Sequence, residues 1–392
     1  MAELPLIFIL VGLAAYVVLG GADFGAGIWV LASRRGEDGV TLRDHARHAM
    51  GPVWEANHVW LIFVLVVCWT AYPSVFGSIT STLSIPLFIA AVGIILRGTA
   101  YAVRAGAQSA REEDLFDRLF GLSSILTPFA LGAVVGGIAS GRVPPGNAKG
   151  DPWSSWLNPT SAAIGVLTVA MCAYLAAVFL AADARRLGEP AVVEAFKKRA
   201  VGAGVLAGAL AVAALPIVSS DAERIWDGLT SGWGLVALAA SGVAGVVTLL
   251  LVRAERFEPA RGAAAVAVAA IIAGWALAQR PYLLPGVTVD DAAAGHSTLV
   301  AVTIGVAVGA VILLPSLAYL FTLVLRGRFD RPVPADVSAA PPTVTSTTRR
   351  IAFAGVCLVV GTTLTVLVDP GWGRIVGVTL LAIFLVTAFP LL

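Results

Sequence analysis

The chain has 392 residues, of which 58% are hydrophobic and 13% charged, and its mean hydropathy is +0.89. The charged share is about half of the roughly 25% typical of soluble domains, which excludes a water-soluble fold. The 26 basic and 24 acidic residues nearly cancel, so the net charge of +2 does not indicate a nucleic-acid partner.

Eleven apolar runs follow one another along the chain, each close to the length of about 20 residues that a membrane-spanning helix needs. They cover residues 5–31, 53–73, 78–104, 119–139, 160–182, 200–218, 232–252, 262–279, 298–325, 351–368 and 374–391. The long connections are polar or rich in Pro and Gly, as hydrated backbone outside the hydrocarbon must be. The sequence therefore predicts an all-α integral membrane protein with about 11 transmembrane helices.

Basic residues are shared unevenly between alternate connections. When Arg104 and Arg374, which stand at the very ends of runs, are counted with the adjoining connections, those after the first, third, fifth, seventh and ninth runs hold 20 of the 26 Lys and Arg residues and the others hold five; Arg97 lies inside the third run. Because basic loops are retained on the cytoplasmic side, we predict a multi-pass protein with its N-terminus and C-terminus outside. The 23 Arg against three Lys, together with abundant Ala and Gly, hint at a GC-rich bacterial genome, so we expect the bacterial plasma (inner) membrane.

Residues 329–350 differ in composition from the rest of the chain: they are rich in Pro, Ser and Thr and poor in large apolar side chains. This composition predicts a flexible cytoplasmic linker. It would separate a membrane domain at 1–328 from an additional two-helix membrane hairpin at 351–392.

Four ionisable residues lie inside the predicted spans: Asp23, Glu55, His58 and Arg97. Such groups cost several kcal/mol in a membrane and by default indicate function. In the predicted orientation all four lie at similar depth near the cytoplasmic face. A titratable acidic cluster with one counter-charge is typical of a proton entry route, since protons hop between groups that can be neutral or charged.

A structural interpretation of the same residues stays open. Asp23 and Arg97 would form an ion pair, and Glu55 would lie at a helix start, where the helix dipole favours a carboxylate. Gly21 and Gly25 form a small-xxx-small pair around Asp23 that favours close helix contact, with Asp23 pointing into a bundle.

The chain offers no self-contained redox or metal centre. Glu55 and His58, which share a helix face with Trp54, have the spacing of half a di-iron site, but the sequence holds no second Glu-x-x-His. The cysteines lie far apart in separate apolar runs, at positions Cys68, Cys172 and Cys357. We therefore predict no catalytic, metal-binding or cofactor-binding residue in this chain alone.

Four segments, GGADFGAGIWVL, GPVWEANHVWLIF, LRGTAYAVR and WALAQRPYLLPG, occur in this order along the chain. Over about residues 1–328 the chain thereby resembles subunit II of cytochrome bd-type quinol oxidases. The resemblance implies a nine-helix core, two four-helix bundles plus one helix, in a heterodimer with subunit I, which carries the haems. It implies a respiratory-chain complex that oxidises quinol, reduces O2 to water and takes protons from the cytoplasm.

In that family subunit II is implicated in conducting those protons toward the oxygen-reducing haem. The family's W-D/E-x-N motif falls on Trp54, Glu55 and Asn57, and its F-D-x-G motif on Asp23 and Gly25. The expected proton-pathway residues are Asp23, Glu55 and His58, with Trp54, Asn57, Arg97, Gly21 and Gly25 packing nearby. A structural quinone or lipid is a further ligand that the resemblance allows.

The chain departs from the family pattern in two places. Many members have an acidic residue three or four positions before the motif aspartate, where this chain has Leu19 and Gly20, so water or His58 would have to complete that part of the path. The hairpin at 351–392 extends beyond the usual nine helices, and we expect it at the periphery of the complex.

Two other classes of function remain as alternatives, a multi-span secondary transporter and a structural membrane scaffold. A transporter would show an inverted-repeat pair of broken helices with charges at the midplane, whereas the charges here cluster at one end. A scaffold would have an inert acidic cluster. The leading hypothesis is a quinol oxidase subunit that is not catalytic alone.

Overall fold

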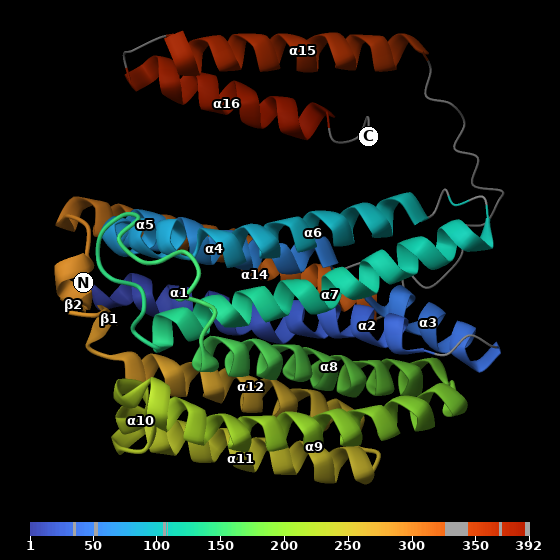
Figure 1. Ribbon diagram of the computed structural model, residues 1–392. Helices are drawn as coiled ribbons and strands as arrows, with labels where there is room; N and C mark the ends of the chain where they lie inside the picture. The colour runs from blue at the N-terminus through green and yellow to red at the C-terminus, as the bar shows by residue number, and fades with distance from the viewer. Residues whose placement is uncertain are drawn as a thin grey trace. The chain divides into compact units, whose positions relative to one another are not determined.

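The computed structural model describes residues 1–33, 37–50, 54–104, 107, 109–325, 344–367 and 371–388. These residues are almost entirely helical, apart from one short β-hairpin (Figure 1). The chain divides into two compact units, Met1–Leu320 and Phe321–Leu392.

The helices of the first unit follow the apolar runs. They are α1 (Glu3–Ala15), the π-helix η1 (Tyr16–Gly20), α2 (Gly21–Ala32), α3 (Glu37–Met50), α4 (Trp54–Ala71), α5 (Pro73–Thr82), α6 (Ser84–Arg104), α7 (Ala110–Ala139), α8 (Pro159–Leu187), α9 (Pro190–Asp221), α10 (Glu223–Leu229), α11 (Gly232–Arg253), α12 (Phe257–Gln279), α13 (Val289–Ala292) and α14 (His296–Leu325), whose last turn enters the second unit. The second unit adds α15 (Val344–Leu367) and α16 (Gly371–Ala388).

Eight helical segments of the described residues are long and apolar enough to cross a membrane. They are the continuous segment from α1 to α2, and α6, α7, α8, α9, α11, α12 and α14; shorter apolar stretches lie in α4, α15 and α16. Each apolar run predicted from the sequence overlaps one of these segments. The all-α membrane class is therefore confirmed.

Helix α8 lies at the centre of the first unit. It packs against α2 and α7 on one side and against α9 and α12 on the other (Figure 1). Its residues Leu175, Ala176, Ala177 and Val178 are fully buried, and the alanines let the neighbouring helices approach closely. The helices thus form two groups, α1–α2 with α4, α6 and α7, and α8 with α9, α11 and α12.

The third predicted run is divided in the structure. Helix α5 ends at Thr82 and α6 begins at Ser84, with Leu83 between them. Pro86 explains the break, because a proline ring collides with the carbonyl four residues earlier, here that of Thr82, in a continuous helix.

The connection between α12 and α14 is more ordered than its Pro/Gly content predicts. Strands β1 (Tyr282–Leu284) and β2 (Val287–Thr288) pair antiparallel, and Gly286 turns the chain with a φ of +75°. The N-terminus lies at this end of the unit (Figure 1), where Arg280 donates to Glu3.

In the second unit, α15 and α16 pack against each other. Gly361 of α15 faces the backbone of Gly377 in α16, which brings the two helices close together. Residues 329–343 of the predicted linker lie outside the described residues, and α15 already begins at Val344.

Candidate functional site

The site is built around an ion pair between α2 and α6. The Arg97 guanidinium donates through Nη1 to Asp23 Oδ2 at 2.9 Å and through Nη2 to Asp23 Oδ1 at 2.8 Å. The side chain of Asp23 is 0% exposed and that of Arg97 is 2% exposed. A bidentate pair of this kind is among the strongest side-chain contacts in proteins, and burial excludes the water that would compete with it.

The remaining faces of Arg97 are also occupied. Its Nη2 donates to the backbone oxygen of Asp23 at 2.9 Å, and its Nε donates to Ser124 Oγ of α7 at 3.1 Å. The guanidinium carbon lies 4.9 Å from the ring centroid of Phe24 and 4.7 Å from that of Phe120. The pair is therefore a fixed charge centre that joins three helices.

The first span passes through the π-helix η1, Tyr16–Gly20, which ends one turn before Asp23. Such π-turns inside α-helices occur frequently at functional sites. The Tyr16 ring lies against Gly20, where an added Cβ would come within 3.1 Å of Tyr16 Cε2. The ring thus fills the space that a longer side chain at position 20 would need.

Polar groups of α4 lie beside this turn. Asn57 Nδ2 donates to the backbone oxygen of Leu19 at 3.4 Å. The His58 ring meets Tyr16 edge-on and is tilted against Phe24, with 6.1 Å between ring centroids in both cases. The Tyr16 hydroxyl is buried and makes no hydrogen bond with the described residues.

The structure brings together Asp23, Asn57, His58 and Arg97 from three separate apolar runs. The backbone of α4 begins at Trp54, but the side chains of Trp54 and Glu55 lie outside the described residues.

Gly21 and Gly25 both face α8. A Cβ at position 25 would lie 1.9 Å from the backbone oxygen of Cys172, and one at position 21 would lie 3.3 Å from Leu175 Cδ1. Glycine at these positions is therefore what lets α2, and Asp23 with it, lie directly against α8.

Sequence reasoning missed three side chains of the site, Tyr16, Phe120 and Ser124. Each stands in an apolar run without a charge, so only the contact with a neighbouring helix distinguishes it from ordinary core. The available signal was weak: the hydroxyl of Ser124 is a polar group within a predicted span.

Among the described residues no group of three or more His, Cys, Asp or Glu side chains is placed to hold a metal ion. His45 of α3 is buried at the end of α8, with Nδ1 2.9 Å from Glu189 Oε2 and Nε2 3.1 Å from the Leu180 oxygen. Both ring nitrogens thus face protein acceptors rather than a ligand. The three cysteines are free thiols.

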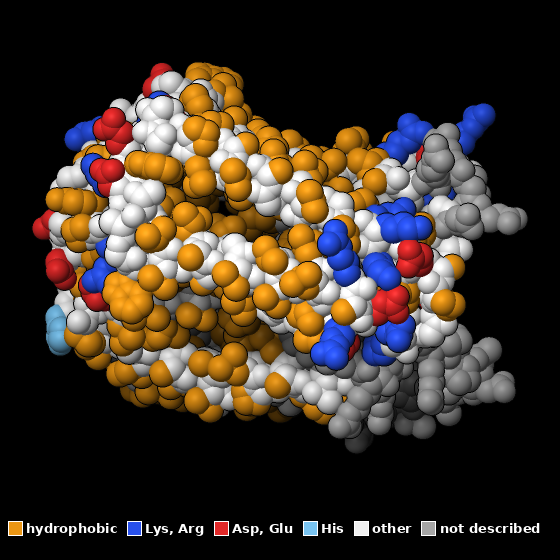
Figure 2. All heavy atoms as spheres, turned by 90° about the horizontal axis from the view of Figure 1, so that it is seen from below, with side chains coloured by type: hydrophobic (Ala, Val, Ile, Leu, Met, Phe, Trp, Pro, Cys, Tyr) orange, Lys and Arg blue, Asp and Glu red, His pale blue; other side chains and the backbone are white. Residues whose placement is uncertain are grey.

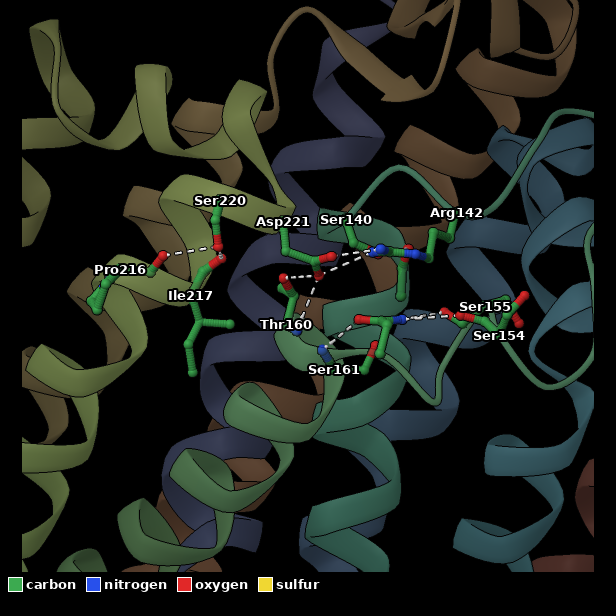
Figure 3. Close-up of polar contacts among 12 residues, drawn as sticks. Ser140, Arg142, Ser154, Ser155, Thr160, Ser161, Pro216, Ile217, Ser220 and Asp221 are labelled. Carbon is green, nitrogen blue, oxygen red and sulfur yellow. Dashed lines mark hydrogen bonds and ion pairs between the residues drawn. The ribbon is translucent and has the colours of Figure 1, made fainter.

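A second polar cluster lies where the connection after α7 meets the start of α8 and the end of α9 (Figure 3). Asp221 accepts from Arg142 Nη1 at 3.0 Å and Nη2 at 2.5 Å, and from Thr160 Oγ1 at 2.6 Å and Thr160 N at 3.2 Å. The carboxylate thereby caps the N-terminus of α8, where a negative charge is favourable. This cluster joins helix ends.

Comparison with known proteins extends over most of the chain. A family model described as cytochrome bd terminal oxidase subunit II matches residues 1–324. A putative cytochrome bd menaquinol oxidase subunit II of Bacillus subtilis (strain 168) is 21% identical over 327 residues, which cover 80% of this chain and 92% of that protein. The bd oxidase of Geobacillus thermodenitrificans has a solved structure that is similar to this chain, with a TM-score of 0.66, 25% identity and coverage of 83% of this chain and 98% of that one.

Two further relatives match over a shorter stretch. The cytochrome bd ubiquinol oxidase subunit 2 of Bacillus subtilis (strain 168) is 27% identical over 132 residues, 34% of this chain. The cytochrome bd-I ubiquinol oxidase subunit 2 of Escherichia coli (strain K12) is 24% identical over 136 residues, also 34% of this chain. These matches span 38% and 35% of the two relatives' own lengths.

Proposed function

Because this chain belongs to the cytochrome bd terminal oxidase subunit II family, we propose that it is the haem-free subunit of a quinol:O2 oxidoreductase. The observation that carries the proposal is the family match over residues 1–324, supported by the fold shared with a bd oxidase of known structure. A partner, subunit I, holds the haems, and there quinol is oxidised to quinone while O2 is reduced to water. Relatives are named for ubiquinol and for menaquinol, so the proposal specifies a quinol only as a class.

The proposed orientation places the basic end of the first unit in the cytoplasm and both chain termini outside. Figure 2 supports it, because Lys and Arg side chains gather mainly at one end of the visible face. Positively charged ends of membrane proteins are retained on the cytoplasmic side.

The second part of the proposal is that Asp23, Glu55 and His58 line a route for cytoplasmic protons. The Asp23 carboxylate is held by the buried Arg97 guanidinium, so we assign it the role of a positioning counter-charge, and Glu55 and His58 exchange the protons. The buried hydroxyl of Tyr16, beside His58, offers a further hydrogen-bonding group at the π-turn.

Co-purification tests the oxidase proposal. The tagged chain, expressed with its neighbouring genes and extracted in mild detergent, should bring down a haem-bearing subunit with a visible absorption spectrum and with quinol oxidase activity. A chain that purifies without haem and transports a solute in vesicles would overturn the proposal and favour the transporter alternative.

Variants test the proton route separately. Glu55→Gln should lower O2 consumption per haem roughly 100-fold, which is the lower end of the loss when a positioned proton-transfer group is removed. Asp183→Asn is the control, since it likewise replaces a carboxylate of a long helix by its amide, at a position that is bonded to Arg261 and does not belong to the candidate site. If Glu55→Gln and Asp183→Asn both turn over at the normal rate with full haem content, the proton route is wrong while the oxidase assignment stands.

A further inference from the structure

A groove of about 540 Å³ lies among α2, α7, α8 and α9, away from the ion pair of the candidate site. Its lining is apolar, with side chains such as Trp29, Phe129, Val166, Ala173 and Leu210. Arg199 of α9 is the one charged residue among those that line it. The volume is in the range of small-molecule sites in proteins.

Arg199 differs from the basic residues around it. Lys197 pairs with Glu255 at 2.8 Å and Lys198 with Glu194 at 3.5 Å, whereas Arg199 makes no ion pair with any residue that the structure describes. Its Nη1 donates to the backbone oxygen of Ala195, one turn earlier, at 3.2 Å. A half-buried guanidinium with most of its five donors unused favours an anion beside it.

Two aromatic rings hold the guanidinium in place. Its central carbon lies 5.6 Å from the ring centroid of Trp29 and 5.3 Å from that of Phe196. Trp29 is itself fixed, because its Nε1 donates to the backbone oxygen of Ala173 at 2.8 Å. An aromatic and a basic residue at one level are typical of the membrane interface, where lipid headgroups lie.

The length of the groove matches one leaflet of a membrane. From Arg199 to Leu210 the helix α9 rises about 16 Å, which is roughly half of the 30 Å hydrocarbon core. A chain lying in the groove would therefore extend from the headgroup level at Arg199 to the middle of the membrane.

We propose that this groove binds one anionic phospholipid, with an acyl chain along the apolar lining and the phosphate on the Arg199 guanidinium. An anionic headgroup supplies the counter-charge that Arg199 lacks among the described residues. A neutral quinone headgroup supplies no charge, and a zwitterionic headgroup carries its own ammonium beside the phosphate. Guanidinium and phosphate form charge-assisted, bidentate hydrogen bonds.

Native mass spectrometry of the purified, delipidated complex tests this site. Phosphatidylglycerol is added back at increasing concentration, with phosphatidylcholine of the same chains and inorganic phosphate as separate arms. We expect one phosphatidylglycerol to be retained tightly by the unsubstituted protein. Arg199→Gln should bind it at least about tenfold more weakly, because the charge-assisted hydrogen bonds to the phosphate are lost, while Arg199→Lys should keep part of the affinity.

Two further variants separate the site from general effects. Arg253→Gln is the matched control, since Arg253 is an exposed basic residue at the end of α11 that also makes no ion pair with the described residues and does not line the groove. Gly202→Leu fills the groove without a backbone clash, because a Cβ at Gly202 meets no atom within 4 Å. Gly202→Leu should abolish tight retention with Arg199 intact, and Arg253→Gln should leave it unchanged.

Several results would overturn the proposal. Retention of phosphatidylcholine as tight as that of phosphatidylglycerol would show that the headgroup is not recognised. Retention of inorganic phosphate as tight as that of phosphatidylglycerol would show that the acyl chain contributes nothing. An equal loss in Arg253→Gln would indicate unspecific charge, and solvent extraction of a quinone instead of a phospholipid would identify a different occupant. None of these measurements depends on oxidase activity.

Discussion

At the scale of single residues, Asp23 and Arg97 depend on each other for their buried charges. Replacing either one leaves the other without a counter-charge at a site that is 0% and 2% exposed. We expect Arg97→Gln to lower the free energy of unfolding by about 3–5 kcal/mol, as for other broken buried pairs. The double variant Asp23→Asn/Arg97→Gln should be more stable than the sum of the two single losses predicts, because no charge is then left unpaired.

Thermal or denaturant unfolding of the complex in detergent measures this coupling. Arg142→Gln with Asp221→Asn gives a comparison pair of the same residue types, with Arg142 35% exposed and Asp221 14% exposed. That pair should show a smaller coupling, since water screens it more strongly. Strictly additive losses at Asp23 and Arg97 would mean that the buried pair contributes no interaction energy.

At the scale of helices, the carboxylate of Glu255 links the turn between α11 and α12 to two further helices, α8 and α9. It lies in the turn between α11 and α12, accepts from Lys197 of α9 at 2.8 Å, and accepts from Arg185 of α8 at 3.3 Å. The hydrogen bond and charge of Lys197, followed by the charge of Arg185, hold the pKa of Glu255 below its ordinary value of 4.5.

This shift predicts a pH dependence of stability with a definite sign. Because the pKa of Glu255 is lower in the folded protein than in the unfolded chain, the ionised carboxylate stabilises the fold. This stabilisation is complete above the ordinary pKa and is lost as the pH falls through the pKa of the folded protein. The difference in Tm between the unsubstituted protein and Glu255→Gln should be constant from pH 7 to about pH 5 and shrink below pH 4.5. Glu223 is an exposed glutamate without an ion pair among the described residues. The difference in Tm between the unsubstituted protein and Glu223→Gln should therefore not change over this pH range.

The positions of the long helices could be predicted from the sequence, because a membrane span needs only a sufficiently long apolar run. The irregular elements could not. The π-turn at Tyr16–Gly20 lies within an uninterrupted apolar run, and the hydrogen bond that its Leu19 accepts comes from Asn57 on another helix. The hairpin at Tyr282–Thr288 had a visible signal in its Pro-Gly pair, which is a turn signature, but its strands are too short to show an alternating pattern.

The candidate site could be predicted only in part, for a related reason. Asp23 and Arg97 are recognisable because charge is rare in apolar runs, and the structural interpretation already paired them. Their supporting shell of Ser124, Phe24 and Phe120 is not recognisable, since serine and phenylalanine are ordinary in spans and gain meaning only through their contact with Arg97.

At the scale of the whole molecule, the proposed orientation makes a prediction for the two ends of the first unit. Lys149 is exposed in the connection between α7 and α8, and Arg256 is exposed in the turn between α11 and α12. A membrane-impermeant maleimide should label Lys149→Cys in intact cells but label Arg256→Cys only after the membrane is permeabilised. The unsubstituted protein, whose cysteines lie within helices, gives the background.

The reverse labelling pattern would place the basic end outside and contradict the proposed direction of proton uptake. Labelling of both positions in intact cells would instead indicate a leaky preparation, which an antibody against a cytosolic protein detects independently.

The π-turn also affects how this chain is aligned with its relatives. A π-turn closes i→i+5 bonds and so holds one residue more than an α-turn, which rotates the side chains before Tyr16 by about 100° relative to an unbroken α-helix through Asp23. A relative with a regular α-helix here has one residue fewer between the two halves of the span. An alignment without a gap then pairs every residue on one side of the π-turn with the neighbour of its true counterpart. The counterpart of an acidic residue three or four positions before the aspartate is therefore found by superposing the helices rather than by counting along the chain.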